Sequence, residues 1–390
     1  MTDDECEQAL STLKADHRLR RLSLIDSATA TTVVQDGRRF LNFSSNNYLG
    51  LAHHPALKRA AAAAIRRFGV GAGASRLLSG NHRLYEALEA AIARFKSAPA
   101  ALVFNSGYVA NLGALGAWIQ PGDFVFCDRL SHASLIEGVR GSAGTLRVYR
   151  HGDVDHLRAL LAGRRGGRRA LIVTDGVFSM DGDIAPLPAL VALAIEYDAQ
   201  VYLDDAHATG VLGSRGAGTC DHFNLHDPRI IQMGTFSKAL GGLGGFVATG
   251  VSQIQYLVNQ SGALIYTTAL PPATLASAIA ALSWIEENPT PRQRLLRHAT
   301  YLRARVAAAG FNIGEGCTPI LPIRIGDNEK AVAFSLRLLE AGFWVPAIRQ
   351  PTVPAGESRL RISLTAAHTR AQIDRLVDAL SSVGRALRIL

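Results

Sequence analysis

Short runs of apolar residues alternate with helical patterns from about residue 100 to residue 250. The runs are continuous rather than alternating, which is typical of strands covered on both faces. Between them, apolar positions recur at helical spacing, most clearly over residues 187–195. This alternation predicts an α/β fold with a mainly parallel central sheet. The predicted strands are Ala101–Phe104, Phe124–Cys127, Leu146–Tyr149, Leu171–Thr174, Val201–Leu203, Ile230–Met233 and Phe246–Ala248.

The pattern changes at Glu287-Asn288-Pro289-Thr290-Pro291, where the chain breaks. After it we expect a smaller α+β domain, with helices at 292–309, 328–341 and beyond 369, and strands at 320–325, 343–348 and 360–363. Before residue 46 we expect an arm with one helix and a hairpin that turns at Asp36-Gly37. The predicted domains are therefore an N-terminal arm (1–45), a large α/β domain (46–288) and a C-terminal α+β domain (289–390).

The bulk composition indicates a globular protein with ample core. The chain has 390 residues, of which 48% are hydrophobic and 19% charged, and a chain of that length usually forms two or more packed units. No apolar run is long enough to cross a membrane, and the acidic opening residues lack the apolar core of a signal peptide. We therefore expect a cytoplasmic protein without a membrane partner. The four cysteines form no CxxC pair, so neither a disulfide framework nor a metal site is expected.

The net charge of +9 raises the hypothesis of a basic nucleic-acid binder. Basic residues are spread along the chain, however, and the densest cluster, at 164–169, lies in a predicted loop without aromatic neighbours. A solvated turn is the better interpretation, so no nucleic-acid partner is expected. Attraction of an acidic substrate, such as a phosphorylated acyl carrier, remains compatible with the charge.

Lysine is rare in this chain, and its placement is informative. Only Lys14, Lys58, Lys96, Lys238 and Lys330 occur, and Lys238 lies in the glycine-rich segment 234–242 directly after a predicted strand. Arginine stays protonated and cannot act as an amine nucleophile, so a lone lysine here favours covalent chemistry. The hydroxyls of Thr235 and Ser237 can bind a phosphate. The alternative is an ordinary surface lysine in a glycine-rich turn.

Another predicted strand ends in Leu203-Asp204-Asp205-Ala206-His207. Adjacent side chains of a strand point to opposite faces, so only one of the two carboxylates is expected to face a site. A buried carboxylate needs a cationic partner, and a protonated pyridine nitrogen is one. A metal site is the alternative interpretation, which the lack of a third ligand at suitable spacing disfavours.

Two further segments, each at the start of a predicted helix, indicate ligand binding only in combination with the motifs above. Asn105-Ser106-Gly107-Tyr108-Val109-Ala110-Asn111 follows a strand and opens a helix, where exposed amides can bind phosphate. Ser131-His132-Ala133-Ser134 begins the next helix, and the His132 ring could stack on a flat ligand. Without that context, Ser131 is an N-cap and His132 a surface residue.

Together these segments resemble the α-oxoamine synthases, which are fold-type-I enzymes dependent on pyridoxal 5'-phosphate (PLP). The resemblance runs from about Arg20 to the last helix. It rests on an ordered set of motifs: Asn42-Phe43-Ser44-Ser45-Asn46-Asn47-Tyr48-Leu49-Gly50, Ser131-His132-Ala133-Ser134, Asp175-Gly176-Val177-Phe178-Ser179-Met180-Asp181-Gly182, Asp204-Asp205-Ala206-His207 and Thr235-Phe236-Ser237-Lys238.

Segments 347–356 and 359–368 are similar to the branch of that family that condenses L-alanine with a pimeloyl thioester for biotin biosynthesis. The chain departs from the family pattern at Asn47, where Asp is frequent, and at Gln350, where Pro is usual. Other amino acids and acyl donors, such as glycine with an acyl-CoA, define the alternatives within the family. A PLP-binding regulator is the non-enzymatic alternative, but the short arm leaves no room for a DNA-binding module.

The resemblance also implies residue roles. Lys238 would hold the cofactor covalently, Asp204 would pair with its ring nitrogen, His207 with its phenolic oxygen, and His132 would stack on the ring. Five further residues would lie near the phosphate or the ring: Gly107, Tyr108, Ser179, Thr235 and Ser237. Thr268 would reach the phosphate held by a second subunit of a homodimer. The implied substrate contacts are Arg20, Asn46, His132, Arg349 and Thr352, with the Arg349 guanidinium binding the amino-acid carboxylate in two bonds.

Overall fold

The computed structural model describes the whole chain except Arg165 and Gly167, which lie in the basic run 164–169 named above. The chain divides into two compact units. Unit 1 comprises Met1–Gly50, Met180–Asp183 and Gln293–Leu390, and unit 2 comprises Leu51–Ser179 and Ile184–Arg292. The expected N-terminal arm and most of the expected C-terminal domain thus fall in the same unit.

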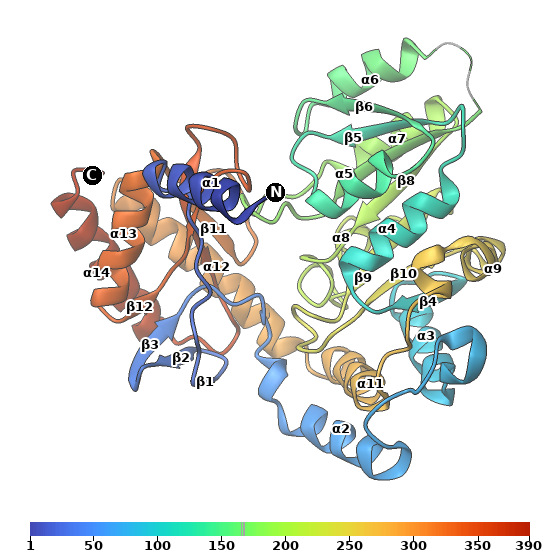
Figure 1. The fold of residues 1–390 in the computed structure, drawn as a ribbon, viewed down its shortest axis with the longest axis horizontal. Coiled ribbons are helices and arrows are strands. Elements are labelled where there is room, and N and C mark those ends of the chain that lie inside the picture. Colours follow the sequence, from blue (N-terminus) through green and yellow to red (C-terminus); the bar gives the residue numbers. More distant parts are fainter. Residues whose placement is uncertain (165, 167) are drawn as a thin grey trace. The chain divides into compact units, whose positions relative to one another are not determined.

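Unit 2 is built on a seven-stranded sheet with the order β4-β10-β9-β8-β7-β5-β6 (Figure 1). Only β10 runs antiparallel to its neighbours, so the predicted mainly parallel α/β sheet is confirmed. The strands are β4 (Ala100–Phe104), β5 (Phe124–Asp128), β6 (Thr145–Tyr149), β7 (Ala170–Asp175), β8 (Ala199–Asp204), β9 (Ile230–Thr235) and β10 (Gly245–Thr249). All seven coincide with predicted strands, extended at their ends by one or two residues.

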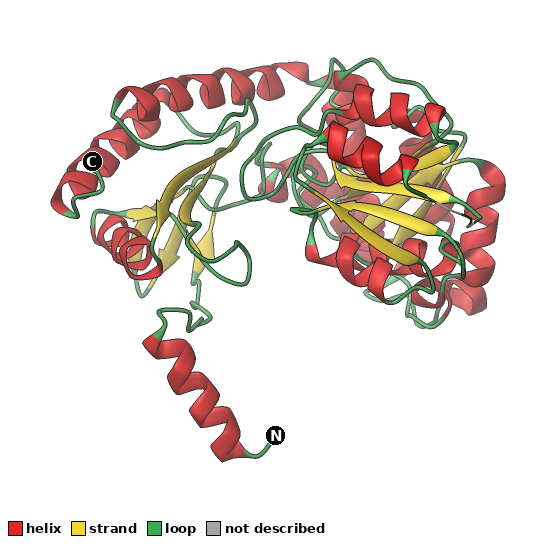
Figure 2. Ribbon diagram, turned by 90° about the horizontal axis from the view of Figure 1, so that it is seen from above, coloured by secondary structure: helices red, strands yellow, loops and turns green. Residues whose placement is uncertain are grey.

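Helices cover both faces of this sheet, as Figure 2 shows. One buried cluster joins the sheet to α4 and α5, and a second joins the other face to α6 and α7. Because helices pack on both faces of the sheet, successive side chains of a strand are apolar, and the strands appear in the sequence as continuous apolar runs. The helices of unit 2 are α2 (Pro55–Phe68), α3 (Arg83–Phe95), α4 (Gly107–Trp118), α5 (Ala133–Arg140), α6 (Val154–Ala162), α7 (Leu187–Glu196), α8 (Thr219–His222), α9 (Val251–Gln260), α10 (Gly262–Ile265) and α11 (Pro272–Glu287), with short turns of helix at η1 (Leu51–His53) and η2 (Arg76–Gly80).

Polar residues collect at one edge of the sheet. Because β5, β7, β8 and β9 are parallel, their carboxyl ends meet at the same edge, where open α/β sheets bind ligands. These strands end in Asp128, Asp175, Asp204 and Thr235. The topology therefore brings together three acids and the segment that carries Lys238.

Unit 1 combines two small sheets with helices. Its hairpin of β2 (Thr32–Gln35) and β3 (Arg38–Asn42) turns at Asp36-Gly37, as predicted, with both residues in the left-handed region at φ of 50° and 71°. β3 also pairs in parallel with β12, which ties the N-terminal arm to the C-terminal segment. The remaining elements are α1 (Asp3–Ala15), β1 (Ser27–Ala28), β11 (Ile320–Gly326), α13 (Asn328–Glu340), β12 (Phe343–Trp344), β13 (Ala347–Ile348), β14 (Ser358–Ser363), α14 (Arg370–Ala386) and α12 (Pro289–Ala308), which begins in unit 2.

One strand prediction in unit 1 is wrong. The apolar run 343–348 forms two short strands in different sheets, because β12 pairs with β3 and β13 pairs with β14. Pro346 lies between them, and its missing N–H prevents an unbroken ladder. Among the described residues, no helix is both long and apolar enough to span a bilayer.

Candidate active site

A cavity of about 210 Å³ lies at the polar edge of the unit 2 sheet. Most of the predicted catalytic and cofactor residues line it, although they come from five separate segments of the chain. The lining consists of Ser106, Gly107, Tyr108, Asn111, His132, Ser134, Asp175, Asp204, Ala206, His207, Met233, Thr235, Ser237 and Lys238. The cavity is therefore the candidate active site.

Asp204 ends β8 and lies at the floor of this cavity, with 4% of its surface exposed. Its Oδ2 accepts a hydrogen bond of 2.8 Å from Nδ2 of Asn111, and its Oδ1 accepts one of 3.0 Å from the backbone N–H of Ala206. Both donors are neutral. A buried carboxylate with neutral donors remains favourable for a cation placed against it.

Asp205 points to the other face of β8, as the strand geometry predicts. Its carboxylate binds Nζ of Lys96 at 2.5 Å and the hydroxyl of Thr219 at 2.6 Å. Lys96 also donates to the carbonyl oxygen of Ala217 at 2.6 Å. The two adjacent acids therefore differ in role: Asp205 belongs to a closed internal ion pair, and Asp204 faces the cavity.

Lys238 follows β9 in a tight turn that returns to the sheet through β10. The N–H of Gly241 donates to the Lys238 carbonyl oxygen at 3.0 Å, and Gly241 has φ of 67°. A side chain at Gly241 would also meet the backbone of Ala52, with a Cβ 2.3 Å from the amide nitrogen. The small residues after Lys238 thus let this turn pack against neighbouring backbone while its side chain lines the cavity.

Two hydroxyls lie beside Lys238. The Thr235 hydroxyl is 2.7 Å from that of Ser237 and donates to the Gly244 carbonyl oxygen at 2.7 Å. The Ser237 hydroxyl can then donate to Thr235 or to a ligand, and Ser237 is exposed to the cavity side of the turn. This pair supplies hydrogen-bond donors suited to an anion.

Helix α4 opens at the same end of the cavity. Ser106 caps it by accepting from the Val109 N–H at 3.1 Å, which leaves the Gly107 and Tyr108 amides among the unpaired donors of its first turn. The strand β10 runs so close that a Cβ on Gly245 would lie 2.6 Å from the Gly107 nitrogen. The Tyr108 hydroxyl donates to the Glu137 carboxylate, so its ring stands at the rim.

His132 is the N-cap of α5 and lines the cavity, so the alternative with Ser131 as the N-cap is wrong. Its Nδ1 lies 2.7 Å from the Ser134 hydroxyl and its backbone N–H donates to Asp175 at 2.9 Å. Burial lowers the pKa of the His132 ring, while Asp204 opposes that change and Lys238 adds to it. Burial, together with the nearby Asp204 charge, raises the pKa of Asp175 well above its usual value.

Two predicted cofactor residues are not among those lining the cavity. Ser179 is the last residue of the first segment of unit 2, directly before Met180–Asp183, which belongs to unit 1. Thr268 is exposed, and its carbonyl oxygen accepts from Asn105 at 2.8 Å while it bridges to Ser75 of the neighbouring segment. Its exposure is what a contact to a second subunit would require.

Four of the five predicted substrate residues belong to unit 1, and the fifth, His132, lines the unit 2 cavity. Arg20 donates to the Gln350 carbonyl oxygen at 3.0 Å and to the Thr352 hydroxyl at 3.4 Å. Arg349 adjoins them, and its pKa is lowered by burial and by the charge of Arg20. Asn46 lies elsewhere in the unit, where its Oδ1 accepts from Arg361 at 3.1 Å. Three of the four residues thus form one cationic cluster within unit 1.

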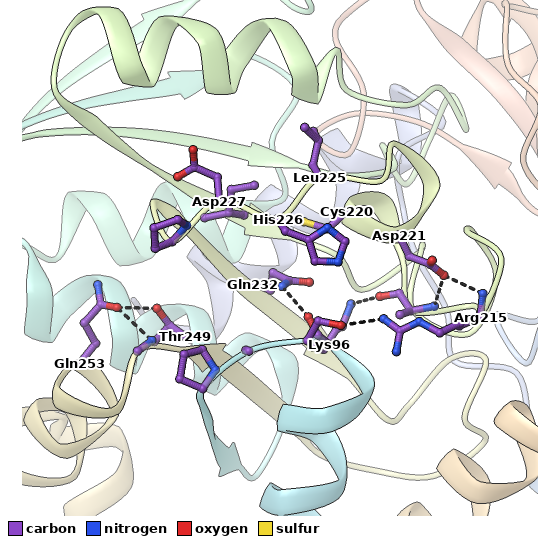
Figure 3. Close-up of a pocket in the computed structure, with 17 residues that line it drawn as sticks. Lys96, Arg215, Cys220, Asp221, Leu225, His226, Asp227, Gln232, Thr249 and Gln253 are labelled. Atoms are coloured by element: carbon purple, nitrogen blue, oxygen red, sulfur yellow. Dashed lines mark hydrogen bonds between the residues drawn. The ribbon is translucent and has the colours of Figure 1, made fainter.

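A second cavity of about 360 Å³ opens at the opposite edge of the sheet, where β9 begins and β10 ends. Figure 3 shows Lys96 there beside Gln232, with Arg215, Asp221 and His226 around them. Its one lysine is fully buried and ion-paired with Asp205, and no predicted catalytic residue lines it. The cavity at the carboxyl edge is therefore the better place for amine chemistry.

Six lining residues carried no predicted role: Ser106, Asn111, Ser134, Asp175, Ala206 and Met233. Asn111 is fully buried within α4, whose other residues are mostly apolar. A single amide in such a helix, four residues after Gly107 and so on the same face, was the available signal. Asn111, Ser134 and Asp175 all lie within motifs named from the sequence, but only the folded sheet brings Ser134 beside Asn111 and Asp175 beside His132.

Comparisons with known proteins agree with this geometry. The family model for aminotransferase class I and II matches residues 38–380. A curated 8-amino-7-oxononanoate synthase from Geobacter sulfurreducens is 48% identical over 383 residues, covering 98% of each chain. A serine palmitoyltransferase from S. paucimobilis, solved with a bound PLP–myriocin adduct, superposes with a TM-score of 0.94 at 31% identity, over 99% of this chain and 98% of that one.

A solved 8-amino-7-oxononanoate synthase from Francisella tularensis superposes with a TM-score of 0.77 at 28% identity, over 89% of this chain and 98% of that one. These matches confirm the fold class and the family resemblance that the motifs indicated. The chain belongs to the class I and II aminotransferase family, alongside the 8-amino-7-oxononanoate synthases.

Proposed function

We propose that the chain is a PLP-dependent C-acyltransferase that condenses L-alanine with a pimeloyl thioester. The products are 8-amino-7-oxononanoate, carbon dioxide and the free thiol, in a step of biotin biosynthesis. One observation carries the proposal: a single cavity holds Lys238 and a buried carboxylate, Asp204, whose hydrogen bonds come from neutral donors. The names of the relatives support the choice of substrates.

The cavity residues fit PLP. Asp204 can bind a protonated ring nitrogen, because a cation offsets the cost of burying its charge. The first-turn amides of α4 and the hydroxyls of Thr235 and Ser237 can bind the phosphate. His207, which is also buried at the cavity, can bind the phenolic oxygen. Bound there, PLP supplies an electron sink for the bonds broken at the substrate Cα.

The side chains then divide the work. Lys238 would hold the cofactor, and its Nζ, when neutral and released, would accept the Cα proton of the substrate and later return one. Asp204 would accept a hydrogen bond from the ring nitrogen and so favour its protonated form. His132 would cover one face of the ring, and the pKa of its imidazole, lowered by burial, favours the neutral form near pH 7. Lysine is suited to both anchor and base because arginine does not lose its proton.

The unit 1 cluster would bind the acidic ends of the substrates. The Arg349 fork matches the alanine carboxylate in two parallel hydrogen bonds, and Arg20 holds the loop that carries it through Gln350 and Thr352. Asn46 would complete the contacts. The excess positive charge suits an acidic acyl donor, either acyl-CoA or a phosphopantetheine-bearing acyl carrier protein. We place this reaction in the cytoplasm.

We further propose that the working form is a homodimer. The segments 69–80 and 266–269 run side by side, joined by the Ser75–Thr268 bridge and by a hydrogen bond of 3.0 Å from Ala269 to Ala74. They leave large apolar side chains uncovered, with exposures of 77% at Val70, 80% at Leu78 and 88% at Tyr266. A second copy would cover them and would bring Thr268 to the partner's phosphate.

The test is a product assay with purified holoenzyme. L-alanine with pimeloyl-CoA, or with the pimeloyl carrier protein, should give carbon dioxide, free thiol and 8-amino-7-oxononanoate in equal amounts. Glycine with acetyl-CoA, and serine with palmitoyl-CoA, serve as comparison pairs, because serine palmitoyltransferases share the fold. Faster turnover of either comparison pair would contradict the proposed substrates, and no turnover of any pair would contradict the enzyme.

A further inference from the structure

Asn111 joins the two sides of the cavity through one buried amide. Its Nδ2 donates to Oδ2 of Asp204 at 2.8 Å and to the Ser134 hydroxyl at 2.8 Å, and its Oδ1 accepts from the Tyr202 hydroxyl at 3.0 Å. Asn111 and Tyr202 are fully buried. Three of the four hydrogen-bonding positions of the amide are therefore used within the protein.

Tyr202 fixes which way round this amide lies. Burial and the nearby Asp204 charge raise the pKa of the Tyr202 phenol well above its usual value, so the hydroxyl stays protonated and donates. A donating hydroxyl requires the amide oxygen opposite it. The NH₂ group must then face Asp204, where it can donate only to an ionised or otherwise accepting oxygen.

The same amide also sets the hydrogen bonds of His132. Because the Ser134 hydroxyl accepts from Asn111, its own proton is available for Nδ1 of His132 at 2.7 Å. The Ser134 N–H also points to that nitrogen, at 3.3 Å. Nδ1 is thus an acceptor, and the ring carries its proton on Nε2. One asparagine therefore directs the carboxylate on one side and the imidazole tautomer on the other.

We propose that Asn111 is a positioning residue that holds Asp204 as an oriented, ionised acceptor for the cofactor ring nitrogen. The inference rests on the proposed function, because it needs PLP in this cavity. Asn111 acts through Asp204 and needs no contact of its own with the cofactor. Its removal should then weaken cofactor binding only while Asp204 is present to be directed.

A double-mutant cycle tests this dependence. The apparent dissociation constant of PLP is measured by equilibrium dialysis of four holoenzymes: wild type, Asn111→Ala, Asp204→Asn and the double variant. We expect Asn111→Ala to raise the constant about tenfold in the wild-type background, as the loss of a hydrogen bond to a charged group implies. In the Asp204→Asn background the same change should raise it less than about twofold.

Milder variants guard against misfolding at this buried position. Tyr202→Phe removes the donor that orients the amide and should raise the PLP constant about threefold, again only with Asp204 present. Tyr149→Phe is the matched control, because Tyr149 is equally buried in the same sheet but its hydroxyl bonds the Thr174 side chain and not Asn111. It should leave the constant unchanged. Should Asn111→Ala yield no soluble protein, the Tyr202→Phe cycle gives the same decision.

The outcomes separate this inference from the proposed function. Equal weakening of PLP binding in both backgrounds would mean that Asn111 supports the fold and not Asp204, and would overturn the inference alone. Unchanged PLP binding in Asn111→Ala would overturn it as well. An unchanged constant in Asp204→Asn would overturn the pairing of Asp204 with the cofactor, and with it the inference.

Discussion

The Nζ of Lys96 lies 2.5 Å from Oδ2 of Asp205, and both side chains are fully buried. Asp204, the last residue of β8, faces the cavity, and the next residue of the chain, Asp205, points to the opposite side and carries the ion pair. The charge of Asp205 is already compensated by Lys96 within the protein. Asp204 is therefore the acid that can pair with a cationic group of a ligand in the cavity.

Removing the cation of this pair should destabilise the protein strongly. Lys96→Met leaves the Asp205 carboxylate buried without its partner, which costs about 3–5 kcal/mol in typical buried pairs. Urea denaturation of the two proteins measures the loss. Lys58→Met, at an exposed position of α2, is the control and should change the unfolding free energy by less than about 0.5 kcal/mol. A small effect of Lys96→Met would show that the pair contributes little.

Lys238→Arg should abolish turnover. Arginine preserves the positive charge but cannot bond the cofactor aldehyde or accept the Cα proton at neutral pH, so we expect the rate to fall about a thousandfold or more. The visible absorbance of the bound cofactor should also disappear. Lys58→Arg should retain both rate and absorbance. A Lys238→Arg protein that kept both would remove this residue from the mechanism.

The buried imidazole of His368 should make stability depend on pH. The ring stacks on Phe43 at 4.2 Å, accepts from the Thr365 N–H at 3.0 Å and lies 3.0 Å from the Asn42 carbonyl oxygen. Burial lowers its pKa to about 4. The unfolded chain, with a pKa near 6.5, binds the proton more readily, so stability is full above that value and falls as the pH drops toward 4.

From this shift we expect a loss of about 2 kcal/mol in unfolding free energy between pH 7 and pH 5. Urea denaturation at both pH values measures it. His368→Phe should flatten the profile by about that amount, whereas His53→Gln, at an exposed position, should leave the profile unchanged. If His368→Phe retains the full pH dependence, other groups are responsible.

Charge placed on the exposed apolar segment should separate the proposed dimer. Leu78→Asp combined with Tyr266→Asp would put two carboxylates in the covered interface, and sedimentation should show a monomer with weakened PLP binding. Leu336→Asp, at a leucine that is 54% exposed on α13, is the matched control and should leave the association unchanged. An unaltered dimer in the double variant would place the interface elsewhere.

Much of this structure follows from local pattern. Six of the seven strands of unit 2 are buried at nearly every position, which made them predictable as continuous apolar runs, whereas the edge strand β6 is partly exposed. The opposite directions of Asp204 and Asp205 follow from the pleat of a strand. The family resemblance, carried by the ordered motifs, is confirmed by the relatives. Individual roles of the candidate site residues stay predictions until they are tested by substitution.

Other features depend on contacts between distant residues and could not be predicted. The split of 343–348 into β12 and β13 arises because Phe343 pairs with Leu41, some three hundred residues earlier. The proposed role of Asn111 depends on its hydrogen bonds with Tyr202, Ser134 and Asp204. No local sequence pattern predicts that these residues lie together. The cation that satisfies Asp205 is likewise Lys96, which lies more than a hundred residues away.

The ion pair of Lys96 also limits where an aldehyde can react on this protein. Of the five lysines, Lys14, Lys58 and Lys330 are exposed, Lys96 is sealed inside the fold, and Lys238 lines the cavity. Arginine, which supplies most of the positive charge, does not condense with aldehydes under these conditions. A reactive carbonyl compound can therefore react with few lysine amines on the surface. Non-specific modification of lysines by free cofactor should be limited to Lys14, Lys58 and Lys330.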